Sequence, residues 1–203
     1  MRLAIGYRPT LRPVSSMEAF LVSTGVVAIA EIGDKTQLLA ILLASKFRRP
    51  WAIVAGIFAA TVANHLLAAS VGTLVAGWLG DELLRWILGL SFIAMGLWAL
   101  IPDKVDEDEA DAGKAGRFGA FIATLVAFFL VEMGDKTQIA TVGLAARFDN
   151  LTMVTLGTTL GMMLANVPAV FLGEAATKVV PLQYVRAAAA AIFVAVGVVT
   201  LLW

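Results

Sequence analysis

The chain alternates long apolar stretches with short polar breaks. Stretches long enough to cross a membrane fall at about 18–45, 51–71, 82–101, 118–146, 151–173 and 183–203. A transmembrane helix needs about 20 apolar residues to cross about 30 Å of hydrocarbon. Because the runs are continuous and do not alternate at every second residue, they predict helices and not the strands of a barrel. The expected fold class is an all-α membrane protein with six transmembrane helices.

The first and fourth stretches differ from the others in length and in charge. Each approaches thirty residues, about 42 Å as an unbroken helix, and each is interrupted midway by charged residues. Such a helix must tilt, kink or break inside a bilayer. Gly33 and Gly134 stand where a break is expected.

The two halves of the chain repeat each other at an offset of 101 residues. This offset places EIGDKTQ (Glu31 to Gln37) on EMGDKTQ (Glu132 to Gln138), and it also places Gly56 on Gly157. Each half carries three predicted spans, an odd number, so the second half must enter the membrane from the opposite side. The sequence therefore predicts two inverted-topology three-helix repeats.

Four domains and an orientation follow from this pattern. The domains are an N-terminal tail (1–16), a first repeat (17–101), an acidic linker (102–117) and a second repeat (118–203). Basic residues near helix ends favour the cytoplasmic side of a membrane. The linker's side collects Lys46, Arg48, Arg49, Lys104, Lys114, Arg117 and Lys178. We therefore expect the linker in the cytoplasm and both termini outside, although the arginines of the tail favour the opposite orientation.

Composition agrees with lipid as the main solvent and excludes several kinds of site. Hydrophobic residues make up 60% of the chain and charged residues 15%, whereas soluble domains are nearer half and a quarter. Basic and acidic residues are equal in number, so nothing indicates nucleic acid. The absence of cysteine excludes disulfides, thiolate metal sites and cysteine nucleophiles. The single histidine, His65, excludes sites that require two histidines.

The repeated motif carries the candidate chemistry. Each copy places a glutamate, an aspartate and a lysine near the middle of a span: Glu31, Asp34 and Lys35, then Glu132, Asp135 and Lys136. Six unpaired charges at membrane depth would cost about 3 kcal/mol each, or about 18 kcal/mol together. This exceeds the stability of a typical protein. The six side chains must therefore face inward and find partners.

Two interpretations of these charges are open. In the first, each lysine pairs with the glutamate four residues before it, Glu31 with Lys35 and Glu132 with Lys136, as a structural ion pair. In the second, the four carboxylates hold a divalent cation, because oxygen ligands without thiolate suit Mg²⁺, Ca²⁺ or Mn²⁺. We favour the second, since the first leaves both aspartates and the motif's other polar groups unused.

The predicted metal ligands are Glu31, Asp34, Glu132 and Asp135. Candidate supporting residues are Thr36, Gln37, Thr137, Gln138, Lys35, Lys136, His65 and Asn166. His65 aligns with Asn166, and either residue could supply a ligand, orient a carboxylate or simply make an interhelical hydrogen bond. Four carboxylates close together cannot all ionise without a cation, so metal binding is expected to release protons.

The two motifs resemble the Glu-x-Gly-Asp-Lys/Arg-Thr/Ser signature of the Gdt-type divalent cation/proton antiporters. That family includes Golgi manganese and calcium transporters and bacterial manganese exporters, within the cation/Ca²⁺ exchanger superfamily. The resemblance covers the chain from about Met17 to its end. It implies a six-helix antiporter that exports Mn²⁺, with Ca²⁺ as a second candidate substrate, and it carries the ligand role to the four motif carboxylates. The compact linker fits a bacterial inner-membrane protein without a cofactor, whose partners are lipid and the cation.

Several alternatives remain beside this interpretation. The chain could be a Ca²⁺-specific or Na⁺-coupled transporter, or a cation channel. A membrane-embedded hydrolase would need a nucleophile with a base or a catalytic metal, and one histidine without a convincing serine partner argues against it. We therefore expect no enzyme. No pattern in the sequence indicates an oligomeric state.

Overall fold

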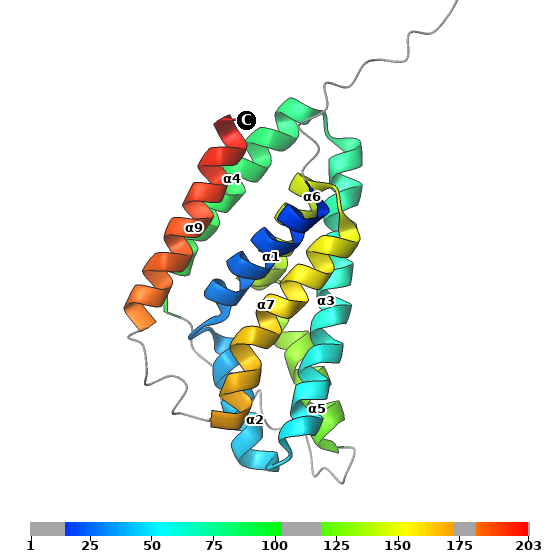
Figure 1. Ribbon diagram of the computed structural model, residues 1–203, viewed down its shortest axis with the longest axis vertical. Helices are drawn as coiled ribbons and strands as arrows, with labels where there is room; N and C mark the ends of the chain where they lie inside the picture. The colour runs from blue at the N-terminus through cyan, green and yellow to red at the C-terminus, as the bar shows by residue number, and fades with distance from the viewer. Residues whose placement is uncertain (1–14, 103–118, 173–181, 203) are drawn as a thin grey trace, which may run out of the picture.

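The computed structural model describes residues 15–102, 119–172 and 182–202 (Figure 1). Within these ranges the chain is helical apart from short connections, and it contains no strand. The helices are α1 (Ser16–Glu31), α2 (Lys35–Phe47), α3 (Pro50–Trp78), α4 (Asp81–Ala99), α5 (Gly119–Glu132), α6 (Lys136–Phe148), α7 (Leu151–Leu172) and α9 (Leu182–Leu202). The all-α prediction is confirmed.

Two of the expected spans are broken in the middle. The first becomes α1 and α2 and the fourth becomes α5 and α6, with three residues outside helix at each junction. Gly33 and Gly134 have φ angles of +79° and +77°, a left-handed conformation that glycine adopts without the steric cost of a Cβ atom. The prediction that the breaks fall at these glycines is confirmed.

Four helices of the described ranges are individually long and apolar enough to cross a membrane. They are α3, α4, α7 and α9. The half-helices α1, α2, α5 and α6 are shorter, with 13 to 16 residues each. The two broken spans therefore do not cross as single continuous helices.

The offset of 101 residues also appears in the helix boundaries. Helix α6 begins and ends 101 residues after α2, and α9 begins 101 residues after α4. Both α2 and α6 end at a residue with left-handed backbone, Arg48 and Asp149. Equivalent positions of the two halves thus adopt equivalent backbone conformations.

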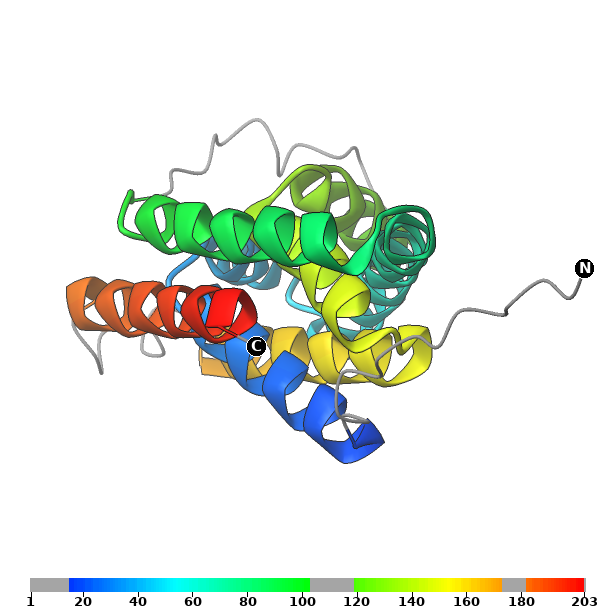
Figure 2. The same cartoon turned by 90° about the horizontal axis from the view of Figure 1, so that it is seen from above.

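Helices from different halves pack against each other (Figures 1 and 2). Helix α1 lies along α7, and α3 lies along α5 and α6. The α4–α9 pair forms one flank of the bundle in Figure 2. Its helices run antiparallel, since Gly89 of α4 meets Leu201 while Gly96 meets Ala190. The centre of the bundle therefore receives side chains from both halves.

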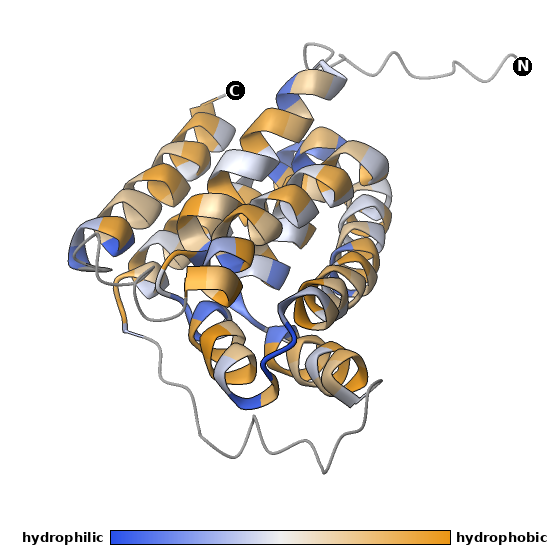
Figure 3. Cartoon of the chain, turned by 60° about the horizontal axis from the view of Figure 1, so that its bottom comes forward, coloured by the Kyte–Doolittle hydropathy of each residue, from blue (hydrophilic) through white to orange (hydrophobic). Residues whose placement is uncertain are grey.

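The surface is apolar and the interior holds the charges. Leu74, Leu97 and Leu130 are each more than 60% exposed, whereas Glu31 and Glu132 are completely buried. Figure 3 shows hydrophobic residues over most of the bundle. In water this arrangement would be unfavourable on both counts, because apolar side chains would be hydrated and charges desolvated. A lipid environment removes the first cost, so the chain is an integral membrane protein.

Several expectations concern residues that the structure does not describe. The predicted tail (1–16) and acidic linker (102–117) lie almost entirely outside the described residues, and so do Lys104, Lys114, Arg117 and Lys178. The predicted cytoplasmic position of the linker stays a prediction.

The close contact of α1 with α7 gives a test of this fold. A Cβ atom on Gly161 would lie 2.7 Å from the Thr24 carbonyl oxygen and 2.8 Å from the Ala28 nitrogen. We expect Gly161→Ala to push α1 away and to lower the free energy of unfolding by about 1 to 3 kcal/mol. The measurement is thermal unfolding in detergent.

Gly25→Ala is the matched control for that substitution. A Cβ atom on Gly25 would meet nothing within 4 Å, and alanine favours a helix over glycine by up to about 1 kcal/mol. We expect equal or slightly higher stability. If both alanine variants unfold at the same temperature, tight α1–α7 packing is not what holds these helices together.

Candidate metal centre

The two helix breaks bring four carboxylates to the middle of the bundle. Glu31 is the last residue of α1 and Asp34 immediately precedes α2. Glu132 and Asp135 take the equivalent places around the second break. All four side chains are buried. Neither aspartate caps its own helix with its side chain, so both carboxylates are available for other partners.

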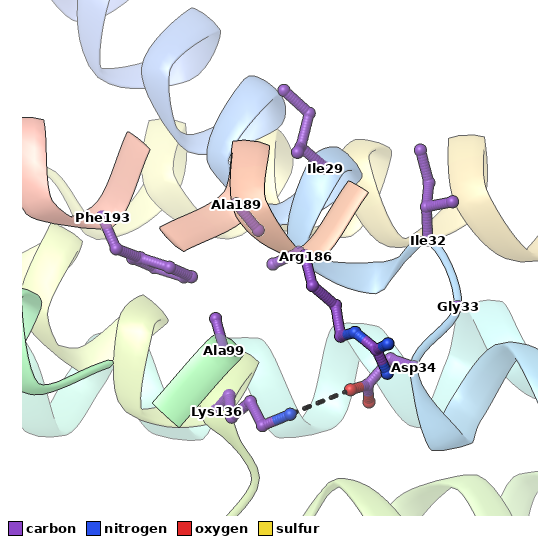
Figure 4. A pocket seen from close by; sticks show the side chains of 10 residues that line it. Ile29, Ile32, Gly33, Asp34, Ala99, Lys136, Arg186, Ala189 and Phe193 are labelled. Atoms are coloured by element: carbon purple, nitrogen blue, oxygen red, sulfur yellow. Dashed lines mark hydrogen bonds and ion pairs between the residues drawn. The ribbon is translucent and has the colours of Figure 1, made fainter. Parts of the chain in front are cut away.

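The lysines of the two motifs form ion pairs across the repeat boundary. Lys35 Nζ lies 3.2 Å from Asp135 Oδ1, and Lys136 Nζ lies 3.5 Å from Asp34 Oδ1. The second of these pairs is drawn in Figure 4. Each motif thus supplies the counter-charge for the aspartate of the other motif.

The interpretation of Glu31–Lys35 and Glu132–Lys136 as ion pairs within one helix is wrong. That pairing assumes a continuous helix, in which residues four apart share a face. The left-handed glycine between them ends one helix and starts another in a new direction. Each lysine is consequently directed toward the other half of the protein.

Three of the four predicted ligands come together as a candidate metal site. One carboxylate oxygen from each of Glu31, Asp34 and Asp135 lies within 4.8 Å of the other two. We call these three residues the carboxylate trio. It draws on both motifs, and all three side chains are buried. Glu132 is not part of this group.

Two threonines hold the glutamate of the trio. Thr36 Oγ1 donates a hydrogen bond to Glu31 Oε2, and Thr137 Oγ1 donates to Glu31 Oε1. One threonine comes from each motif. These hydroxyls therefore orient a predicted ligand, and they do so across the repeat boundary.

The motif glutamines stabilise the helix breaks. Gln37 Oε1 accepts a hydrogen bond of 2.8 Å from the Gly33 nitrogen, and Gln138 Oε1 accepts one of 2.6 Å from the Gly134 nitrogen. Gln37 Nε2 also donates to the Ala165 carbonyl of α7. Their amide oxygens are thus used on the backbone, which gives both glutamines a structural role.

The aligned pair His65 and Asn166 has two different environments. His65 Nε2 lies 3.7 Å from Glu132 Oε2, and both side chains are completely buried. Asn166 Nδ2 donates to the Met162 carbonyl oxygen at 3.1 Å, within its own helix. The histidine therefore faces a motif carboxylate, whereas the asparagine bonds locally.

Two residues near the trio were not among the sequence-derived candidates. Arg186 of α9 lines a pocket with Asp34 and Lys136, and its side chain points toward Asp34 in Figure 4. Lys136 Nζ also lies 5.8 Å from the centre of the Trp98 ring, within range of a cation–π interaction. The repeat offset could have drawn attention to Arg186, because it aligns with Arg85. For Trp98, the repeat offset gives no comparable indication.

Comparisons with known proteins give matches along most of the chain. The family model "Divalent cation/proton antiporter GDT1" matches residues 19–107 and 120–203. A protein of Vibrio cholerae serotype O1 named "Putative manganese exporter" is 48% identical over 185 residues, 91% of this chain and 90% of its own. GDT1-like protein 5 of Arabidopsis thaliana is 27% identical over 93% of this chain and 97% of its own. No solved structure matches the chain.

The ion pairs across the repeat boundary can be tested by double-mutant cycles. We expect Lys35→Met and Asp135→Asn to be coupled by about 1 to 3 kcal/mol in unfolding free energy, because each single variant leaves either the buried aspartate or the half-buried lysine without its partner. The measurement is denaturation of the purified protein in detergent without metal.

A second cycle serves as the control. Lys35→Met combined with Glu31→Gln should give a smaller coupling than the first cycle, since these two residues form no ion pair in the described structure and interact only through their shared neighbour Asp135. A larger coupling for Lys35 with Glu31 than with Asp135 would restore the pairing within one motif.

Proposed function

The chain belongs to the GDT1 divalent cation/proton antiporter family, and we propose that it exports Mn²⁺ from the cell in exchange for protons. The observation that carries this proposal is the buried carboxylate trio of Glu31, Asp34 and Asp135, built from both motifs. The manganese-exporter name of the Vibrio cholerae relative supports Mn²⁺ as the substrate. Ca²⁺ is the alternative substrate.

The spacing of the trio suits a hard divalent cation. Ligands on opposite sides of one ion, with bonds of about 2.1 to 2.5 Å, lie about 4.2 to 5 Å apart. The trio's ligand oxygens lie within 4.8 Å of one another. Three carboxylates without a thiolate favour Mn²⁺, Mg²⁺ or Ca²⁺ over copper or zinc. One ion could therefore bind all three side chains with small adjustments.

The family description names protons as the counter-ion, and the charge balance of the two motifs agrees with it. Four carboxylates and two lysines carry a net charge of −2 when all six groups are ionised. The lysines pair with the two aspartates, which leaves the charges of Glu31 and Glu132. Either one divalent cation or two protons would neutralise them. We propose that these two states alternate, with two protons exchanged for each cation.

The architecture we propose for this exchange is six transmembrane segments in two inverted repeats, with the cation site where the repeats meet. The shared helix boundaries, the equivalent breaks and the ion pairs between the halves support it. Broken helices around a central site are typical of secondary transporters. The linker would face the cytoplasm of a bacterium, with both termini outside the inner membrane.

Removing one carboxylate of the trio tests the site. We expect Glu31→Gln and Asp135→Asn to lower Mn²⁺ transport in proteoliposomes at least about tenfold, since even outer-shell changes at metal sites cost 10- to 100-fold. Cells that produce either variant should be as sensitive to Mn²⁺ as cells without the protein.

Glu18→Gln is the matched control on the same helix as Glu31. Glu18 is exposed near the start of α1, so its neutralisation should leave transport unchanged. Full transport by both trio variants would remove these carboxylates from the site. Loss of transport in Glu18→Gln would instead indicate general damage to α1.

Proton exchange predicts a measurable release of acid. Adding Mn²⁺ to the purified, weakly buffered protein should release about two protons per bound ion and so lower the pH, because the cation replaces the protons that neutralise the site. In proteoliposomes, Mn²⁺ entry should drive protons out of the lumen, as reported by a trapped pH dye. Binding without proton release, together with transport that requires Na⁺, would identify sodium as the counter-ion.

A further inference from the structure

The fourth motif carboxylate, Glu132, shares a second buried polar group with His65. Neither Glu132 oxygen and neither His65 nitrogen has a hydrogen-bond partner among the described residues. Both side chains have no solvent exposure. A buried polar group left without a partner costs about 1 to 3 kcal/mol, and hydrocarbon around the bundle offers no water to replace it. Four buried atoms without hydrogen-bond partners, on two neighbouring side chains, therefore suit a polar ligand.

The separation of these two side chains suits a shared cation. Glu132 Oε2 and His65 Nε2 are 3.7 Å apart, which is too long for a direct hydrogen bond. Two ligands on one ion, with bonds of about 2.1 Å at angles of 90° to 120°, lie about 3.0 to 3.6 Å apart. A shift of a few tenths of an ångström would let one ion bind both atoms.

Helix α3 supplies further oxygen atoms close to His65 in the sequence. Asn64 and Thr61 stand one and four residues before His65, and Asn64 Oδ1 and Thr61 Oγ1 have no hydrogen-bond partner among the described residues. Asn64 Nδ2 donates to the Phe129 carbonyl of α5, three residues before Glu132. This bond holds the polar face of α3 against the end of α5 that carries the glutamate.

We propose that Glu132 and His65 form a second binding position for the transported cation, beside the carboxylate trio, which selects Mn²⁺ and similar transition-metal ions against Ca²⁺ and Mg²⁺. The proposal rests on the transport function proposed above. Ca²⁺ and Mg²⁺ favour all-oxygen sites, whereas imidazole nitrogen suits transition metals. The trio offers only oxygen, so His65 supplies a chemical distinction that the trio lacks.

The other repeat provides no equivalent nitrogen ligand. Its aligned residue, Asn166, bonds to the carbonyl oxygen and sulfur of Met162 in its own helix. The aligned carboxylate, Glu31, already accepts hydrogen bonds from Thr36 and Thr137. Two nearly identical motifs therefore have different surroundings, and an imidazole nitrogen lies 3.7 Å from the glutamate of the second.

The test replaces the histidine by the residue of the other repeat. In proteoliposomes, His65→Asn should lower the ratio of Mn²⁺ to Ca²⁺ transport about tenfold, because loss of a metal-binding contact costs 10- to 100-fold. The decrease should come from slower Mn²⁺ transport, with Ca²⁺ transport retained. Asn166→Ala is the positional control and should leave the ratio unchanged.

A spectroscopic measurement identifies the ligand directly. Electron spin echo spectroscopy of Mn²⁺ bound to the unaltered protein should show coupling to a ¹⁴N nucleus, and His65→Asn should remove it. A bound Mn²⁺ without nitrogen coupling, or an unchanged transport ratio in folded His65→Asn, would overturn the second binding position. The spectrum of the unaltered protein decides the matter even if the variant fails to fold.

The same experiments separate this inference from the proposed function. If the unaltered protein neither binds nor transports any divalent cation, the proposed function fails. If it transports Mn²⁺ and Ca²⁺ but gives no nitrogen coupling, the trio stands and the selective role of His65 is lost.

Discussion

Ionisable side chains at the centre of an apolar bundle must neutralise one another, because an unpaired charge in hydrocarbon costs about 3 kcal/mol or more. The ion pairs Lys35–Asp135 and Lys136–Asp34 meet this requirement between the two halves of the chain. They can form only if α2 and α6 begin close together, with their first residues facing each other. The breaks at the two motif glycines, and the glutamines that hold those glycines, serve this arrangement. Much of the central structure thus follows from the cost of burying charge.

The helical fold and the positions of the breaks could be predicted from the sequence, because hydrophobic length and a glycine beside charge are local signals. The ion-pair partners of the charged residues could not be predicted from the sequence. Helical periodicity indicates Glu31 as a partner of Lys35, but that periodicity ends at Gly33. The chemistry of the glutamines makes them candidate supporting residues of the cation site, whereas in the structure their oxygens accept hydrogen bonds from backbone nitrogens. Once a helix breaks, the spacing of two residues along the chain no longer tells whether their side chains point in the same direction.

The two motifs are nearly identical, yet their glutamates have unlike partners. Both motif threonines donate to Glu31, and Glu132 faces His65 without a hydrogen bond among the described residues. The difference comes partly from outside the motifs, since the aligned positions on α3 and α7 hold histidine and asparagine. Both copies of the motif can therefore keep the charged residues that the fold needs, while the residues around each copy give its glutamate a different role.

The same electrostatic requirement links folding to coupling. The lysines balance the two aspartates, but the two glutamates leave a net charge of −2 if every group is ionised. A transporter in that state would hold uncompensated negative charge in a low-dielectric interior, at a cost of several kcal/mol per ion. The exchange proposed above would relieve this cost, because either a divalent cation or protons would neutralise the site. In the exchange that we propose, the empty, fully ionised protein is the state that the membrane disfavours most.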